Sequence, residues 1–184
     1  MSESVGQILA AIAALPAEER AALLERLAGD AASTAQAAAP LSFSTGELQG
    51  AADYILVFDG GARGNPGPGY GSYDLTRRQD GKHDLVRLDS GRQMTNNEAE
   101  YETLVAALQG LIERIEETGR AAGDFTVEVR GDSRLVLNQV SGDWKTKNDR
   151  MQLLRDQVRS LLSRFQAHRL VHQERAESVR VLGH

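Results

Sequence analysis

The order of strand-like and helix-like segments in residues 53–184 constrains the fold more than any other feature of this sequence. Three strand-like segments come first, and a long amphipathic helix follows them from Thr95. A further strand, two helices and a last strand complete the pattern. The expected strands are Tyr54–Asp59, Tyr70–Arg77, His83–Asp89, Phe125–Arg130 and Ala167–Val171, and the expected later helices are Ser133–Gln139 and Asn148–Phe165. This order predicts an α/β fold in which a mixed five-stranded sheet is flanked by helices.

The first 52 residues differ in composition from the rest. Two apolar stripes at helical spacing lie within residues 8–15 and 23–27, and Pro16 separates them. They predict a small helical hairpin in residues 1–30. Residues 31–52 are rich in alanine, serine, threonine, glycine and glutamine, which is typical of a flexible linker. We expect the hairpin to self-associate or to dock on the main domain, residues 53–184; a solubilising appendage is the alternative.

Composition limits the possible function classes. The chain has no cysteine, which excludes disulfides and thiolate zinc sites. It has no apolar stretch near the ~20 residues that cross a bilayer, and its start lacks the basic segment of a signal peptide. We therefore expect a cytoplasmic protein that is not in a membrane. The net charge is −5, but residues 1–52 carry six acidic and only two basic side chains. The remainder is nearly balanced, so charge neither supports nor excludes a nucleic-acid partner.

Three acidic residues stand where a sheet and a helix direct side chains toward a ligand. Asp59 ends an apolar strand before two glycines, Asp132 follows the strand that ends at Arg130, and Glu98 lies in the first turn of the long helix. The carboxyl ends of strands in open α/β sheets face the crevice where ligands bind. Three carboxylates gather there only if a cation offsets their repulsion. Oxygen ligands without cysteine favour Mg²⁺ or Mn²⁺.

Each of these acids also has a structural interpretation. Asp132 can cap the following helix, Glu98 can complement the dipole of the long helix, and Asp59 can form a turn before the glycines. Chance rarely places three acidic residues at two strand ends and a helix start in one chain, so the three together favour a metal site.

These residues lie in three motifs that resemble those of the ribonuclease H type I family. Residues 58–67, Phe-Asp-Gly-Gly-Ala-Arg-Gly-Asn-Pro-Gly, are similar to its first motif. Residues 95–100, Thr-Asn-Asn-Glu-Ala-Glu, resemble the second, and residues 131–133, Gly-Asp-Ser, the third. The resemblance covers residues 53–184. It implies a ribonuclease H-like fold and an endoribonuclease that hydrolyses the RNA strand of RNA–DNA hybrids, leaving 5′-phosphate and 3′-hydroxyl ends.

The resemblance also implies the chemistry of the site. Two Mg²⁺ or Mn²⁺ ions, about 4 Å apart, would activate a water and stabilise the leaving oxygen. Asp59 would bridge them, and Glu98 and Asp132 would complete the ligands. Contacts to 2′-hydroxyl groups would distinguish RNA from DNA. The residues expected to bind the hybrid are Gly60, Gly61, Arg63, Gly64, Asn65, Thr95, Asn96 and Asn97, with Lys145 and Lys147 toward the DNA phosphates. Turn formation and helix capping are the alternative roles of the asparagines.

The family's fourth metal ligand, an aspartate near the C-terminus, has no counterpart when the sequences are matched without gaps. Leu182 then takes its place, and leucine cannot bind a metal. Two extra residues after Arg175 bring Gly183-His184 to that place instead, and the imidazole and terminal carboxylate of His184 are both metal ligands. We therefore expect His184 to replace the missing ligand, with a frayed terminus as the alternative.

Two further residues have open roles. His172, at the end of the last expected strand, is a catalytic candidate for proton transfer, with a structural role as the alternative. Trp144 is expected to pack over the core, with stacking on a sugar as the alternative. Two other functions also remain. One is a catalytically impaired module that binds hybrids without cleaving them, and the other is a different nuclease on the same fold. The second motif and the glycine-rich stretch argue against the latter.

Overall fold

The computed structural model describes residue 48 and residues 50–183, and these contain a five-stranded sheet with the strand order β3-β2-β1-β4-β5. β1 pairs antiparallel with β2 and parallel with β4, so the expected mixed sheet is confirmed. The strands are β1 (Tyr54–Ala62), β2 (Gly67–Arg77), β3 (His83–Met94), β4 (Thr126–Gly131) and β5 (Ala167–His172). The helices are α3 (Asn96–Glu117), η1 (Ala122–Asp124), α4 (Arg134–Ser141), α5 (Asp149–Leu162) and α6 (Arg175–Leu182). The predicted hairpin and all but a few residues of the predicted linker lie outside the described residues.

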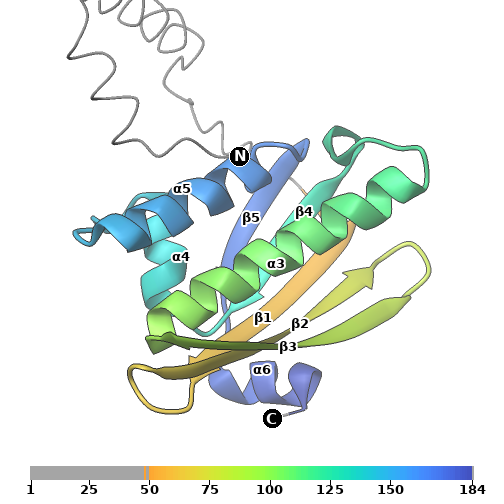
Figure 1. The fold of residues 1–184 in the computed structure, drawn as a ribbon. Coiled ribbons are helices and arrows are strands. Elements are labelled where there is room, and N and C mark those ends of the chain that lie inside the picture. Colours follow the sequence, from red (N-terminus) through yellow and green to blue (C-terminus); the bar gives the residue numbers. More distant parts are fainter. Residues whose placement is uncertain (1–47, 49, 184) are drawn as a thin grey trace, which may run out of the picture. The chain divides into compact units, whose positions relative to one another are not determined.

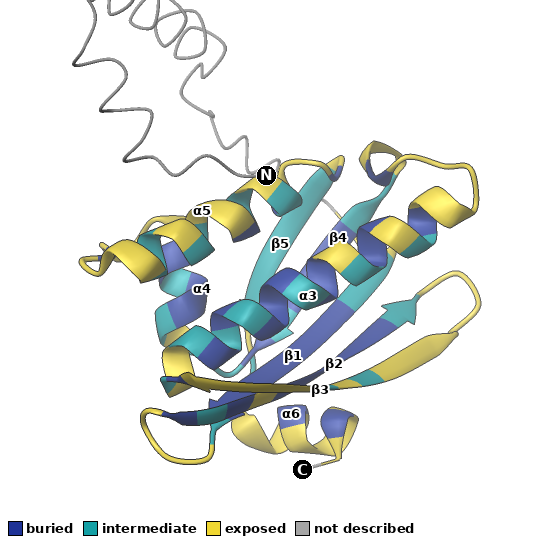
Figure 2. Ribbon diagram, in the orientation of Figure 1, coloured by how far each residue is buried: buried dark blue, intermediate teal, exposed yellow. Residues whose placement is uncertain are grey.

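Helices cover both faces of the sheet. α3, α4 and α5 lie on one face, and α6 lies on the other (Figure 1). Because side chains alternate along a strand, β1 sends Leu56 and Phe58 toward α3, and Val57 and Asp59 toward the face that carries α6. β1 is the central strand, and six of its nine residues are buried (Figure 2).

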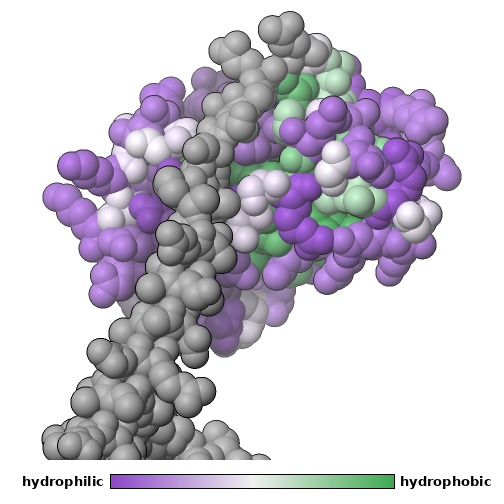
Figure 3. All heavy atoms as spheres, turned by 90° about the horizontal axis from the view of Figure 1, so that it is seen from above, coloured by the Kyte–Doolittle hydropathy of each residue, from purple (hydrophilic) through white to green (hydrophobic). Residues whose placement is uncertain are grey.

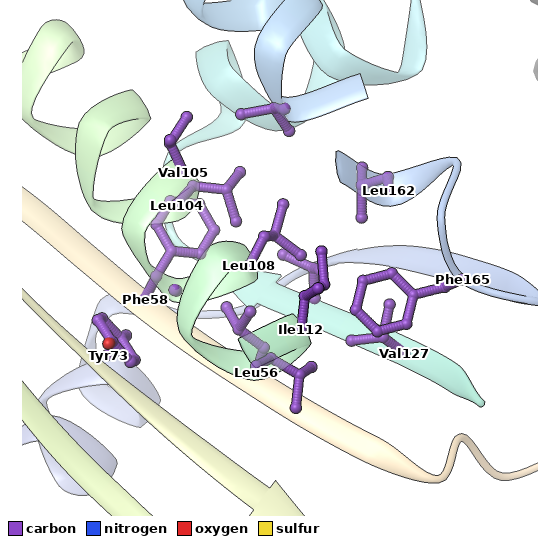
Figure 4. Close-up of a cluster of buried hydrophobic side chains, with 14 of the residues drawn as sticks. Leu56, Phe58, Tyr73, Leu104, Val105, Leu108, Ile112, Val127, Leu162 and Phe165 are labelled. Atoms are coloured by element: carbon purple, nitrogen blue, oxygen red, sulfur yellow. The ribbon is translucent and has the colours of Figure 1, made fainter. Parts of the chain in front are cut away.

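The core lies between the sheet and α3. Leu104, Leu108 and Ile112 follow the helical period along α3 and are at most 2% exposed. They pack with side chains from β1 and β4, among them Leu56 and Val127, and with residues of the later helices (Figure 4). The amphipathic pattern that predicted the long helix is therefore the pattern that builds this core.

The loop that follows Asp59 is shorter than the sequence predicts, because part of the glycine-rich stretch after Asp59 belongs to the strands. The expected strands end at Asp59 and begin again at Tyr70, but β1 continues to Ala62 and β2 begins at Gly67, in unbroken antiparallel register. The glycines serve close packing instead. A Cβ on Gly71 would overlap the hydroxyl of Thr103 on α3, and one on Gly69 would overlap Met94. Glycine here lets the hairpin lie directly against its neighbours.

The surface of the described residues is mostly polar. On the face seen in Figure 3, hydrophilic residues predominate and a smaller hydrophobic area lies among them. No described helix has the length and apolar character needed to span a membrane.

Candidate functional site

Three carboxylates meet where β1, α3 and β4 come together. Asp59, Glu100 and Asp132 each have an oxygen within 4.8 Å of the others. Asp59 is buried, and the other two are partly buried. The convergence follows from the sheet, because Val57 pairs with Arg130 in parallel register and Asp59 and Asp132 follow two residues later.

A glycine brings the helix to this pair. The backbone of α3 passes so close to β1 that a Cβ on Gly60 would lie 2.5 Å from the carbonyl oxygen of Ala99 and 2.7 Å from the Cα of Glu100. Real side chains cannot occupy that space. The absence of a side chain at position 60 therefore sets the separation between Asp59 and Glu100.

The predicted triad needs one correction, since the structure brings Glu100 rather than Glu98 to the two aspartates. Glu98 accepts hydrogen bonds from the backbone nitrogen and the hydroxyl of Thr95, at 2.7 and 2.9 Å. The first of these, together with the bond that the backbone nitrogen of Glu98 donates to the hydroxyl of Thr95 at 3.3 Å, forms the capping box of α3. Its other oxygen lies 2.8 Å from the Nε atom of Arg150. The backbone hydrogen bond holds the pKa of Glu98 below its usual value. Its carboxylate is thus occupied in capping and pairing.

The Glu100 carboxyl group has an unusual environment. Burial raises its pKa to about 7, the hydrogen bond from the hydroxyl of Ser133 opposes this rise, and the charges of Asp132 and Asp59 add to it. Ser133 also caps α4 by accepting from the backbone nitrogen of Val136. A single serine therefore orients Glu100 and begins the helix that follows Asp132.

The cluster fits a divalent cation. All three side chains offer hard oxygen ligands, and their mutual repulsion gives a bound cation a strong electrostatic advantage. Arg175 forms an ion pair with Asp132. Its Nη1 atom lies 3.5 Å from the carboxylate, and the arginine side chain is largely exposed. Such a contact offsets only part of the negative charge.

The raised pKa predicts how stability depends on pH without metal. The pKa of Glu100 is 4.5 in the unfolded chain and about 7 in the folded one. The folded state thus binds this proton more tightly, and the resulting stabilisation is complete below pH 4.5 and lost as the pH rises through 7. We expect the melting temperature in EDTA to fall between pH 5 and 8 by less in Glu100→Gln than in the wild type. Parallel curves for the two proteins would contradict this assignment.

The loop between β1 and β2 meets the start of α3 in a rim that carries the predicted substrate residues Asn65, Asn96 and Asn97. Asn96 accepts a hydrogen bond from the backbone nitrogen of Ala62 at 2.9 Å, and Asn65 accepts one from the backbone nitrogen of Asn96 at 3.2 Å. Gly64 has a φ of 111°, which turns the loop between β1 and β2. The asparagines thus hold the loop against the start of α3. Asn97 is exposed there, whereas Gly60 and Gly61 are buried in β1.

The other predicted residues lie on separate elements. Lys145 and Lys147 are exposed in the loop between α4 and α5. Trp144 in the same loop is 50% exposed, so the expectation that it packs over the core is wrong. His172 pairs with Gly131, the residue before Asp132, and its Nε2 atom lies 3.4 Å from the Nε atom of Arg134. It is therefore close to the cluster in the sheet.

The C-terminal prediction extends beyond what the structure describes. Leu182, the residue matched to the missing aspartate, is fully buried under the sheet. Its carbonyl oxygen accepts a hydrogen bond from Arg87 of β3 at 3.3 Å. Gly183 ends α6 beside the same guanidinium group. His184 itself lies outside the described residues.

Sequence reasoning missed Glu100, Ser133 and Arg175. The second motif contains two glutamates, and the pattern Thr95-x-x-Glu98 is itself a capping-box signature. That signal would have assigned Glu98 to the helix cap and left Glu100 for the site. The contact of Arg175 depends on the position of α6, which no local pattern gives.

Comparisons with known proteins agree with this geometry. The model of the family described as reverse transcriptase-like matches residues 58–181. Ribonuclease HI of Halobacterium salinarum is 37% identical over 126 residues, which are 67% of this chain and 57% of that protein. The bifunctional protein Rv2228c of Mycobacterium tuberculosis is 36% identical over 115 residues, 60% of this chain and 28% of that protein. The chain thus covers less than two thirds of the length of these relatives.

Solved structures extend the likeness to the fold. The RNase H1 of Halobacterium salinarum superposes with a TM-score of 0.56 at 34% identity, over 69% of this chain and 89% of that one. LC11-RNase H1 in complex with an RNA/DNA hybrid gives a TM-score of 0.58 at 30% identity, over the same shares. The expected ribonuclease H-like fold is confirmed by these likenesses. Motifs, family model and fold together show that the chain belongs to the ribonuclease H type I family.

Proposed function

We propose that this protein is an endoribonuclease that hydrolyses the RNA strand of RNA–DNA hybrids. The observation that carries the proposal is the convergence of Asp59, Glu100 and Asp132 within 4.8 Å, one from each of the three motifs. A similar protein, LC11-RNase H1, has been crystallised with an RNA/DNA hybrid. This supports the same class of substrate for the present chain.

The three carboxylates would hold Mg²⁺ or Mn²⁺, with two ions expected. Once bound, the ions would supply activation of a water and stabilisation of the leaving oxygen, which would give 5′-phosphate and 3′-hydroxyl products. The chain's own residues position this chemistry. Ser133 orients Glu100 by its hydrogen bond, and the parallel register of β1 and β4 holds Asp59 and Asp132 side by side. His172 is our proton-transfer candidate, because it pairs with the residue that precedes Asp132.

The hybrid would contact two regions. The rim formed by Arg63, Gly64, Asn65 and the start of α3 would meet the RNA strand near the cut. The exposed Lys145 and Lys147 would meet phosphates of the DNA strand. Contacts to 2′-hydroxyl groups by the rim would select RNA over DNA.

One assay separates the candidate functions. The purified protein is incubated with a labelled hybrid, duplex RNA and duplex DNA of one sequence, with Mg²⁺ or Mn²⁺ and then with EDTA. We expect cleavage of the RNA strand of the hybrid only, abolished by EDTA. Binding of the hybrid without cleavage under either metal would favour the impaired module. Cleavage of duplex DNA would favour a different nuclease on this fold.

The role of His184 has its own test. We expect deletion of His184 to lower metal-dependent cleavage by at least about tenfold, because loss of a ligand weakens metal binding and activity. Cleavage rates across a Mn²⁺ titration measure the effect, and excess Mn²⁺ should restore part of the loss. Undiminished cleavage by the shortened protein would show that three carboxylates suffice.

Three expectations about the rest of the chain are proposals from the sequence alone. They are the helical hairpin in residues 1–30, its self-association or docking, and a cytoplasmic location. Sedimentation of the full chain and of a chain that begins at residue 44 would test self-association.

A further inference from the structure

A recess of about 560 Å³ opens on the sheet beside the carboxylate cluster. It is lined mainly by Arg63 from the loop after β1, Tyr70 and Ser72 from β2, and Arg87 and Asp89 from β3. Tyr70 pairs with Asp89, and Ser72 pairs with Arg87. Directly opposite residues of antiparallel strands share a face of the sheet. Since Ser72 also pairs with Asp59, the recess lies on the same face as Asp59.

The register also gives the distance to the cluster. Asp59, Ser72 and Arg87 form one row across β1, β2 and β3. Neighbouring strands are about 4.8 Å apart, so the row from Asp59 to Arg87 spans about 10 Å. A nucleic-acid strand whose reacting phosphate lies at Asp59 would reach the recess with an adjacent nucleotide.

The side chains of the recess suit a phosphate and a sugar. Two arginines and a single carboxylate line the recess, and guanidinium groups bind phosphate oxygens with paired donors. That carboxylate, on Asp89, lies 3.7 Å from Arg63, with both side chains about two thirds exposed. An exposed contact of this kind is weak, so a phosphate can replace it. Arg63 also lies over the ring of Tyr70, at 5.8 Å from its centre.

Tyr70 and Arg87 are placed to receive a ligand. Tyr70 is 36% exposed, and aromatic side chains commonly stack on the bases of RNA. Arg87 is held at one point by its hydrogen bond to the carbonyl oxygen of Leu182. An arginine already anchored loses less conformational freedom when it binds a phosphate.

We propose that this recess binds the RNA nucleotide next to the cleaved one, with Arg63 and Arg87 on its phosphate and Tyr70 against its sugar or base. The strand assignment rests on the proposed function, because the strand that reaches Asp59 is the strand that is cut. The three carboxylates can bind metal without any contact between the RNA and the recess. The recess thus adds affinity and register for the RNA strand, separate from metal binding.

The test measures hybrid binding in EDTA, where no cleavage occurs, by fluorescence anisotropy at several salt concentrations. We expect Arg63→Ala and Arg87→Ala each to weaken binding about tenfold, the usual effect of losing a charge-assisted contact. Each should also lower the magnitude of the salt slope by about 1. Arg78→Ala, at an exposed arginine near the turn between β2 and β3, is the matched control and should change neither value. Unchanged melting temperatures would exclude misfolding.

A substituted hybrid identifies the phosphate. The wild type first maps the cut site with Mg²⁺, and single neutral methylphosphonates are then placed one or two nucleotides from it in the RNA strand. We expect a methylphosphonate at one of these positions to weaken hybrid binding by the wild type. The same substitution should have little further effect on hybrid binding by Arg63→Ala or Arg87→Ala. If Arg63→Ala and Arg87→Ala match Arg78→Ala in hybrid affinity, salt slope and sensitivity to methylphosphonates while the wild type cleaves hybrid, the recess proposal is wrong and the proposed function stands. If the wild type neither binds nor cleaves hybrid, both are overturned.

Discussion

Glu100→Gln is expected to lower the rate of hybrid cleavage by roughly a thousandfold or more, while Glu98→Gln keeps it within about threefold of the wild type. The first change removes a carboxylate from the cluster, and transition-state stabilisation by a bound metal is worth several kcal/mol. The second removes an ion pair with Arg150, whose guanidinium side chain is 51% exposed, and a pair with one partner in solvent is worth little. Glutamine also serves at this position of a capping box. Single-turnover cleavage with saturating hybrid and Mg²⁺ measures both.

Stability should change in the opposite sense to activity. At pH 8 and in EDTA, Glu100→Gln replaces a partly buried carboxylate beside Asp59 and Asp132 with a neutral side chain, and we expect a higher melting temperature than in the wild type. Glu98→Gln should be equal to the wild type or slightly less stable. The reverse outcome, an inactive Glu98→Gln and an active Glu100→Gln, would restore the original assignment of Glu98.

Gly60→Ala should be the most damaging single-methyl change near the site. Its Cβ would lie 2.5 Å from the carbonyl oxygen of Ala99, an atom of the helix backbone that cannot rotate away. Overpacking of this kind costs about 1–3 kcal/mol or more. Because α3 must shift, Glu100 moves relative to Asp59, and displacements near 1 Å lower rates by about a hundredfold. Urea unfolding and cleavage assays on the folded variant measure the two effects.

Gly123→Ala is the matched control for this glycine. A Cβ there would meet only the carbonyl oxygen of Arg164 at 3.6 Å, an ordinary contact. Alanine at a compatible position leaves stability unchanged or slightly raises it. If Gly60→Ala behaved like Gly123→Ala in both assays, the close approach of β1 and α3 would not set the geometry of the cluster.

Most of the fold could be predicted because its elements carry strong local signals. The apolar period of α3 and the alternating strands were sufficient to place the sheet and the main helix. Two expected strands were too short for one physical reason, because β1 continues past Asp59 to Ala62 and β2 begins at Gly67 rather than at Tyr70. The glycines after Asp59 have the composition of a loop, but they extend the β1–β2 hairpin, because their lack of side chains permits contact with α3. Local composition does not show what a strand will pack against.

The site could be predicted in part. Asp59 and Asp132 were found because one ends and the other follows an expected strand, and the parallel register of β1 and β4 brings the two residues side by side. The sequence contains two glutamates at the start of α3, and only the one whose side chain points toward Asp59 and Asp132 can join them. Glu98 and Glu100 are two residues apart, which on a helix turns their side chains in different directions. The recess lined by Arg63 and Arg87 could not be predicted, because its residues come from three segments joined only by the register.

The central claim is that Asp59, Glu100 and Asp132 bind the metal ions of a ribonuclease. Crystals grown without metal and soaked in Mn²⁺ test it most directly through anomalous scattering. We expect anomalous peaks among these three carboxylates, about 4 Å apart if two ions bind, and their loss in Glu100→Gln crystals. Peaks at Glu98 or no ordered manganese at the cluster would contradict the claim.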